Sequence, residues 1–469
     1  DSRTSSRPPS SDAPWSSAGG AEAPEEPPEA SAAEAEESQE PAADKTSKTD
    51  NPTAAKRPGR RPGSPGHSRT QKLPVSETIA HAPEHCALCG RALADQPFTA
   101  RTGLYVLDLE PITAGELAGI RLCHDKHLYG ERMCACGHCT RTEPGRCEAE
   151  PLWTVSLSEW HLIGPRLASL IVCLAQRLRL SRRKIQEFLR DWLGVALSTA
   201  VISQCLLEAG RAVEPLEEAL VEELQQATLA YADETPWKEA GQLLWLWVIS
   251  SATVCVYFIG YRSHEILANV FGESFAGWLM SDGYCVYRGF TYRLRCWAHL
   301  LRKARGLGES LSGEAACFGT ATKQLLDEAM DAIYQAREGP PVDLRADFQE
   351  RLAAFRTLCE HHRDSSHEKT RALAREFLND WDVIWTVLAH PHLPLTNNEA
   401  ERLLRHWVMV RRTSQGTRTA QGSRALALLA SVIETCRKRK VLPWPYLAQV
   451  IAERRKGNPA PPLPAAEMA

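Results

Sequence analysis

The hydrophobic period of the chain changes at residue 227, and this change limits the possible folds more than any other feature. From there to residue 296, short apolar runs of strand length replace the wider helical spacing that precedes them. Five strands are predicted, at Ala227–Asp233, Leu243–Ile249, Val254–Ile259, Gly277–Ser281 and Arg293–Cys296, with helices at His264–Val270 and Ala298–Gly306. Three consecutive strands followed by alternating helices and strands indicate a mixed α/β layer.

One stretch of these predicted strands has to be considered as a possible transmembrane segment. Gly241 to Tyr261 carries no charged residue and is long and apolar enough to cross a bilayer. Its middle, Ser250–Thr253, is small and polar, and its flanks have strand length and strand residues. We therefore expect a β-hairpin and no membrane contact.

Helical spacing dominates on both sides of the predicted sheet. Leu167–Leu224 contains two segments, Ser181–Trp192 and Thr199–Ala209, that resemble a helix-turn-helix, although ordinary helix pairs also have short turns. The first part is basic, through Arg177, Arg179, Arg182, Arg183, Lys184 and Arg190. Residues 313–390 are also helical, and a further helix is predicted at Asn397–Arg412.

Cysteine is concentrated near the N-terminal side, where seven of the 15 residues lie between Cys86 and Cys147. Two C-x-x-C pairs, Cys86 with Cys89 and Cys136 with Cys139, would supply the four thiolates that structural Zn²⁺ prefers. Other residues could replace one ligand: His81, His85, Cys123, His124, Cys134 and His138. The alternative is a set of buried free thiols, and either interpretation favours a reducing cytosol over a disulfide framework.

The net charge of -3 hides a strong segregation of charge. Residues 1–75 are rich in Pro, Ala, Ser and Glu and are expected to be disordered. Their acidic part is followed by a basic arm, which is either a solvated linker or a phosphate-contacting segment: Lys56, Arg57, Arg60, Arg61, Arg69 and Lys72. Residues 402–440 carry ten Lys and Arg against the single acid Glu434, as expected for phosphate contacts.

Three acidic residues could hold metal ions. Asp233 and Asp282 are predicted to close two strands, and Glu401 lies on the later predicted helix. Carboxylates placed in this way can bind two Mg²⁺ ions about 3.5 to 4 Å apart. Each also has an ordinary structural explanation, since Asp-Gly forms turns, Asp233 can cap the segment after it, and Glu401 can pair with Arg405 along a helix.

Four short motifs make the chain resemble the IS66 family of bacterial insertion-sequence transposases, over nearly everything after residue 55. In chain order they are Ala232-Asp233-Glu234-Thr235, Ser281-Asp282-Gly283-Tyr284, Cys296-Trp297-Ala298-His299 and Asn397-Asn398-Glu399-Ala400-Glu401-Arg402. The resemblance implies an RNase H-like α/β catalytic domain with a mixed five-stranded sheet and a helical insertion. A zinc-binding module and a helical, helix-turn-helix-like region are expected to precede it.

The resemblance also implies an enzyme with a D-D-E triad, namely Asp233, Asp282 and Glu401, binding two Mg²⁺ or Mn²⁺ ions. Glu399 is the rival for the third position, but two residues on a helix differ by about 200° in direction, so both cannot face the metals. The implied reaction is cleavage at the element ends by water, followed by attack of the freed 3′-OH on target DNA. We expect a role near this site for His299, with core packing as the alternative.

The predicted organisation has five parts: a disordered tail with a basic arm at 1–75, a zinc module with Cys86, Cys89, Cys136 and Cys139 at 76–150, a helix-turn-helix-like region at 151–225, a catalytic domain at 226–412 and a basic C-terminal region at 413–469. The predicted DNA contacts are Arg182, Arg183, Lys184, Arg402, Arg405, Arg411 and Arg412.

Partners are expected to be the element ends, target DNA, further copies of the chain and accessory proteins of the element, in the bacterial cytoplasm and at the nucleoid. The alternative function is a non-catalytic, domesticated DNA-binding protein. The chain starts without Met, so the helical lead of the family is expected to be missing.

Overall fold

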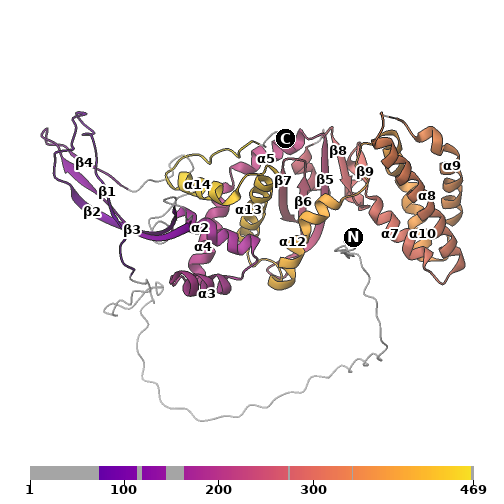
Figure 1. Cartoon of the computed structure of the whole chain (residues 1–469), viewed down its shortest axis with the longest axis horizontal. Helices are drawn as coiled ribbons and strands as arrows, with labels where there is room; N and C mark the ends of the chain where they lie inside the picture. Colours follow the sequence, from indigo (N-terminus) through magenta and orange to yellow (C-terminus); the bar gives the residue numbers. More distant parts are fainter. Residues whose placement is uncertain (1–72, 113–118, 144–162, 273–274, 341, 466–469) are drawn as a thin grey trace, which may run out of the picture. The chain divides into compact units, whose positions relative to one another are not determined.

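The computed structural model describes residues 73–112, 119–143, 163–272, 275–340 and 342–465. The predicted disordered tail and its basic arm lie outside the described residues up to residue 72, and so does Cys147. Elements are labelled as in Figure 1.

The central feature is a five-stranded mixed sheet, which confirms the layer predicted from the change of period. Its strands are β5 Leu229–Glu239, β6 Gln242–Ser250, β7 Cys255–Gly260, β8 Trp278–Ser281 and β9 Arg293–Arg295. They lie in the order β7-β6-β5-β8-β9. The first three are antiparallel neighbours, whereas β8 and β9 run parallel to β5. The antiparallel half of the sheet and its parallel half therefore meet at β5.

The uncharged stretch from Gly241 to Tyr261 forms the predicted hairpin. Strands β6 and β7 pair from Trp245 opposite Gly260 to Ser250 opposite Cys255. The turn closes through the N–H of Ser251, which donates to the carbonyl of Val254 at 2.9 Å. Among the described residues, no helix has the length and apolarity needed to cross a membrane.

Strand β5 is longer than predicted, which corrects the expected position of Asp233. The sequence predicts that the strand ends at Asp233, but it continues to Glu239, paired with β6 throughout. Pro236 is tolerated because β8 pairs with β5 only up to Tyr231, so no ladder bond on that side needs the missing N–H. Asp233 thus lies within β5, just beyond the point where β8 stops pairing.

The helical insertion predicted at 313–390 is present. It consists of α8 Gly313–Arg337, α9 Arg345–His362, α10 Glu368–Asn379 and α11 Trp381–Ala389, preceded by α6 His264–Phe271 and α7 Trp297–Gly308. Phe355, Phe377 and Trp385 pack in its interior, in a core that extends to Leu294 and Met280 of the sheet. Figure 1 shows α8, α9 and α10 gathered on the β9 side of the sheet.

A second core joins regions that the predicted organisation divides. It contains residues of α2 Pro165–Val172, α3 Arg182–Leu193, α4 Thr199–Val213, α5 Leu216–Gln225, α13 Ala420–Lys438 and α14 Pro443–Arg455, together with one face of the sheet. Helix α13 lies on β7, where the hydroxyls of Ser431 and Thr435 accept the N–H groups of Tyr257 and Cys255. Packing therefore crosses the boundaries predicted at residues 225 and 412.

The Cys-rich segment forms a separate small sheet. Its strands are β1 Thr78–His81, β2 Thr99–Ile112, β3 Gly119–Met133 and β4 Cys139–Arg141. Strand β3 lies between β1 and β2 and also pairs with β4. The two knuckles that carry the cysteines lie before β2 and between β3 and β4.

Candidate active site and metal centre

Asp233 and Asp282 come from neighbouring parallel strands in matching positions. Tyr231 of β5 lies opposite Met280 of β8, so each aspartate follows a paired residue by two positions. Side chains two apart share a face of a sheet, and Met280 is buried in the core of the helical insertion. Asp233 therefore projects on the side of the sheet that faces this insertion, and Asp282 directly follows the end of the neighbouring strand β8.

Glu401 reaches the same region from helix α12 Asn398–Ser414, which begins where the sequence predicts a helix. Its Oε1 lies 3.8 Å from Nδ1 of His299, in the first turn of α7. Glu399 has a different direction, since its carboxylate pairs with Arg402 and with Lys438 at 2.5 and 2.7 Å. The structure thus separates the two rivals as the helical rotation requires.

Negative charge accumulates around Asp233. Burial, then the charges of Glu234 and Asp282, raise the pKa of Asp233 well above its usual range, and Glu401 adds to the same effect. In the described part of the chain, the three carboxylates of the expected triad do not form a group whose ligand atoms all lie within 4.8 Å of one another. Two ions about 3.5 to 4 Å apart do not require the ligand atoms of all three carboxylates to lie this close together, because carboxylates that bind different ions are farther apart.

Asn397 fixes the start of α12 against β5, a role that the sequence does not predict. It is fully buried, and its Nδ2 donates to the carbonyl of Ala232 at 2.9 Å. Its backbone N–H donates to Sγ of Cys296 at 3.2 Å. The paired asparagines of the motif were a signal for such a role, because a buried amide needs polar partners.

His299 and Glu401 both lack hydrogen bonds at the atoms that face each other. Nδ1 of His299 and Oε1 of Glu401 are buried, and neither has a hydrogen-bond partner in the part of the chain that the structure describes. Burial, opposed by the charge of Glu401, lowers the pKa of His299. A neutral imidazole beside an unpaired carboxylate oxygen is an arrangement suited to binding a cation.

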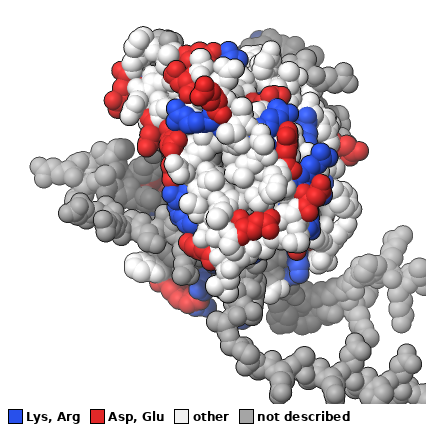
Figure 2. Space-filling model, turned by 90° about the vertical axis from the view of Figure 1, so that its right-hand side faces the viewer, with Lys and Arg blue, Asp and Glu red and all other residues white. Residues whose placement is uncertain are grey.

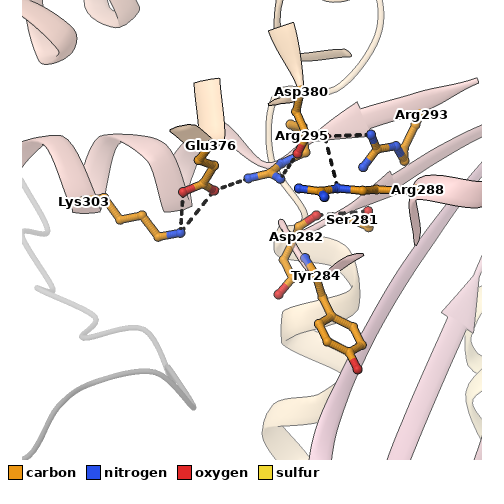
Figure 3. A network of polar contacts seen from close by, with 9 residues as sticks. All are labelled: Ser281, Asp282, Tyr284, Arg288, Arg293, Arg295, Lys303, Glu376 and Asp380. Atoms are coloured by element: carbon orange, nitrogen blue, oxygen red, sulfur yellow. Dashed lines mark hydrogen bonds and ion pairs between the residues drawn. The ribbon is translucent and has the colours of Figure 1, made fainter. Parts of the chain in front are cut away.

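A network of charged groups lies beside the loop that carries Asp282 (Figure 3). Arg295 of β9 is fully buried and pairs with Glu376 and with Asp380, the latter at 2.6 Å. Asp380 also accepts from Arg293 at 2.9 Å, and Lys303 reaches Glu376 at 2.8 Å. The network links α7 and the helical insertion to β9.

The backbone of Gly283 lies against this network. A Cβ on Gly283 would lie 2.6 Å from both terminal nitrogens of Arg295. The nearby N–H of Tyr284 donates to Oδ1 of Asp282 at 2.9 Å, as in an Asx turn. The Asp282-Gly283 pair is thus a turn, in agreement with its ordinary structural explanation, and also the place where Arg295 meets the backbone.

The cysteine cluster differs from the predicted ligand set by one residue. The four thiols that lie together are Cys86, Cys89, Cys134 and Cys136, with ligand atoms within 4.8 Å of one another, whereas Cys139 is not among them. Cys139 opens β4, and its thiol contacts the side chains of Glu131 and Arg141 on the small sheet. Cys134 is one of the residues that the sequence offers as a replacement for one of the four ligands.

The predicted DNA contacts fall into two groups. Exposed residues of α3, Arg183 and Lys184, have no ion pair among the described residues, and neither do Arg405 and Arg412. Arg182 instead donates to the hydroxyl of Ser203 at 3.3 Å. The others are engaged: Arg402 with Glu399, and Arg411 with Thr235 and the carbonyl of Pro236.

The wider basic segment, 402–440, is also more structural than expected. Arg424 pairs with Glu214 and Glu217, Lys438 with Glu399, and the buried Arg439 with Glu223. The surface over the helical insertion is mixed as well, with Lys and Arg interspersed among Asp and Glu on the face in view (Figure 2). The ten Lys and Arg residues of this segment are therefore not all available for phosphate contacts.

The two predicted segments of the helix-turn-helix are α3 and α4, joined by a short connection after Gly194. The hydroxyls of Ser181 and Ser198 accept backbone N–H groups and cap the two helices. Helix α4 is buried along most of its length, at Ile202, Cys205, Leu206, Ala209 and Val213. Its exposed residues are Thr199 and Ala200 in the first turn, then Gln204 and Arg211.

Comparison with known proteins assigns the chain to a class. Residues 161–425 match the family described as Transposase IS66 family, which is more than half of the 469 residues. The chain belongs to the IS66 transposase family, and the resemblance carried by its four motifs is confirmed.

Two relatives come from Sinorhizobium fredii (strain NBRC 101917 / NGR234). Uncharacterized protein y4qI is 25% identical over 304 residues, which is 58% of this chain and 56% of the relative. Uncharacterized protein y4jO is 29% identical over 127 residues, which is 27% of this chain and 38% of the relative. The matches thus span about half or less of these relatives.

Proposed function

We propose that this chain is a DNA transposase that cuts the ends of an insertion sequence and joins them to target DNA, with Asp233, Asp282 and Glu401 as its metal-binding carboxylates. The observation that carries the proposal is the crowding of negative charge around Asp233, to which Asp282 and Glu401 both contribute. Several negative charges around one buried carboxyl group lower the stability of the fold, which favours a functional explanation for their presence.

We further propose that the sheet is RNase H-like, as the family resemblance implies. The support is its topology, with three antiparallel strands continued by two parallel ones and Asp233 on the strand where the two halves meet. Asp282 follows the first parallel neighbour of that strand. The helical insertion enters between β9 and α12, and so separates the two aspartates from Glu401 in the sequence.

The residues present fit hard divalent cations. Mg²⁺ and Mn²⁺ prefer carboxylate oxygens, and Oε1 of Glu401 is buried without a partner among the described residues. When bound, two such ions would activate the attacking water or 3′-OH and stabilise the departing 3′ oxygen. A cation would also relieve the repulsion that raises the pKa of Asp233.

The chain's own contribution is to hold its carboxylates in place. Asn397 ties the start of α12 to the residue before Asp233, and Arg295 supports the loop of Asp282. His299 lies against Glu401. Because all of these groups lie on or beside regular elements, little rearrangement would be needed when DNA arrives.

DNA contact is proposed for the bases that the fold leaves available. These are Arg183 and Lys184 on α3 and Arg405 and Arg412 on α12, all without an ion pair among the described residues. Phosphate contacts of this kind would give binding that weakens as salt rises. Zn²⁺ in the cluster of Cys86, Cys89, Cys134 and Cys136 would have a structural role, since four thiolates leave no open position. Self-association on DNA, accessory proteins and a place at the nucleoid stay predictions.

The test is cleavage of a supercoiled plasmid that carries the element ends, in Mg²⁺ or Mn²⁺. Wild type is expected to nick it and Asp233→Ala is not, at equal DNA occupancy. Glu239→Gln is a matched control, because it removes a charge from the far end of the same strand. Equal nicking by wild type and Asp233→Ala would contradict the proposal and leave the alternative, a non-catalytic DNA-binding protein.

A further inference from the structure

A second group of metal-binding atoms overlaps the proposed catalytic site. Cys296, His299 and Glu401 place their ligand atoms within 4.8 Å of one another, and none of the other expected carboxylates belongs to this group. Cys296 precedes α7, His299 lies in its first turn, and Glu401 comes from α12. The three donors therefore meet where β9, α7 and α12 converge.

The donor atoms of His299 and Glu401 face each other but form no hydrogen bond. Nδ1 of His299 and Oε1 of Glu401 are 3.8 Å apart, too far for a hydrogen bond, and both are buried without partners in the described part of the chain. Buried polar atoms are nearly always paired in folded proteins. Two buried polar atoms that face each other without a hydrogen bond are suited to bind a common ligand.

The chemistry of the three donors selects the kind of ion. A thiol, an imidazole and a carboxylate match the three protein ligands of open zinc sites, whereas Mg²⁺ has little affinity for sulfur. Ligands at zinc distances of about 2.0 to 2.3 Å lie roughly 3.3 to 3.8 Å apart around a tetrahedral ion, so the group has to contract by only about 1 Å. The N–H of Asn397, 3.2 Å from Sγ of Cys296, would stabilise a thiolate there.

We propose that Cys296, His299 and Glu401 form a separate binding site for a thiophilic divalent cation such as Zn²⁺, and that its occupation withdraws Glu401 from the catalytic carboxylates. The second half rests on the function proposed above. Closing on a zinc ion held by Cys296 and His299 would draw the carboxylate of Glu401 toward α7, away from the position that it would take for Mg²⁺ beside Asp233 and Asp282. Zn²⁺ would therefore inhibit cleavage by taking Glu401, without needing to displace Mg²⁺ from Asp233 and Asp282.

The metal site is tested first by binding, without reference to activity. The full chain is loaded with one equivalent of Zn²⁺, which fills the cluster of four cysteines, and is then titrated with Co²⁺. Coordination by Cys296 is expected to give a thiolate-to-cobalt charge-transfer absorption with this second metal. Its absence in wild type would overturn the proposal.

Two variants and a control assign that absorption to a residue. Cys296→Ser is expected to lose it, whereas Cys317→Ser, which changes an exposed cysteine of α8, is expected to keep it. Absorption of wild-type strength in Cys296→Ser would contradict the site. Should that variant fail to fold, His299→Gln is expected to weaken Co²⁺ binding by about tenfold or more, and unchanged binding would overturn the proposal equally.

Inhibition is tested separately, by plasmid nicking at constant Mg²⁺ with rising Zn²⁺. Wild type is expected to lose activity, and Cys296→Ser to need about tenfold more Zn²⁺ for the same relative loss. If nicking fails without Zn²⁺ but the cobalt absorption appears, the proposed function fails and the metal site stands. If nicking proceeds but no cobalt absorption appears, the metal site fails and the function stands.

Discussion

The side-chain amide of Asn397 donates to the carbonyl oxygen of Ala232 at 2.9 Å, and so joins the start of α12 to the residue before Asp233. The bond connects positions 165 residues apart, and both of its ends are buried. It is the contact that sets the start of the helix of Glu401 against the strand of Asp233, and Arg411 adds contacts to the same strand near the other end of the helix. The distance between these two carboxylates therefore depends on a residue that carries no charge.

Asn397→Ala is expected to lower cleavage by about 10- to 100-fold, because it releases the helix that carries Glu401 without removing a carboxylate. The carbonyl of Ala232 would be left unpaired, at a cost of about 1 to 3 kcal/mol in the free energy of unfolding. Plasmid nicking and denaturant unfolding measure the two effects. A loss of stability with undiminished nicking at a temperature where the variant is folded would show that Asn397 does not position the site.

Glu401→Gln is expected to reduce cleavage at least about 100-fold, since it removes one oxygen charge from the metal-binding set. Glu399→Gln is the matched control two residues away, and it is expected to retain most activity because Glu399 pairs with Arg402 and Lys438 instead. Both are compared by nicking rate at saturating Mg²⁺. The reverse order of effects would make Glu399 the third carboxylate.

Gly283→Ala is expected to destabilise the chain by about 1 to 3 kcal/mol, because its Cβ would meet the buried guanidinium of Arg295. Cleavage should fall as well, since the strained loop carries Asp282. Gly306→Ala is the control: this glycine lies in α7 with no atom within 4 Å of an added Cβ, so the change should be neutral or slightly stabilising. Equal stability of both variants would remove the proposed role of the Arg295 contact.

Cys134→Ser is expected to lose bound zinc, whereas Cys139→Ser is expected to keep it. The reason is that Cys134 lies with Cys86, Cys89 and Cys136, while Cys139 contacts Glu131 and Arg141. Elemental analysis of the purified variants measures the metal content directly. Zinc retained by Cys134→Ser and lost by Cys139→Ser would restore the ligand set predicted from the two C-x-x-C pairs.

Asp233→Asn is expected to stabilise the chain near neutral pH in buffer without Mg²⁺. Burial, then Glu234 and Asp282, raise the pKa of Asp233, so the folded chain keeps a proton that the unfolded chain releases above about pH 4. The contribution of the Asp233 carboxyl group to the stability of the fold is therefore present below that pH and is lost as pH rises.

The thermal unfolding midpoint of Asp233→Asn should accordingly exceed that of wild type at about pH 7 and approach it at about pH 4. Added Mg²⁺ should raise the midpoint of wild type more than that of the variant, because metal bound only to the folded state stabilises it. A gain that does not depend on pH would contradict the electrostatic explanation.

Much of the fold could be predicted from local pattern. Alternation and run length locate the five strands of the sheet, and the hairpin at Gly241–Tyr261 is indicated by its polar centre. Local propensity ends strand β5 too early, because Asp233 and Pro236 are both poor strand residues. The pairing of β5 with β6 continues past them to Glu239, which is a tertiary effect that no local propensity contains.

The sequence by itself determined the strands of the central sheet, the helical insertion, the order of the four motifs and the family, because periodicity and short motifs are local properties of a chain. Only the tertiary structure decided which side chains meet. It replaced Cys139 by Cys134 in the thiol cluster, turned Lys438 and Arg439 from free bases into partners of Glu399 and Glu223, and brought Cys296 and His299 to Glu401. Each of these outcomes depends on the direction of side chains from elements far apart in sequence, which is set by packing and register.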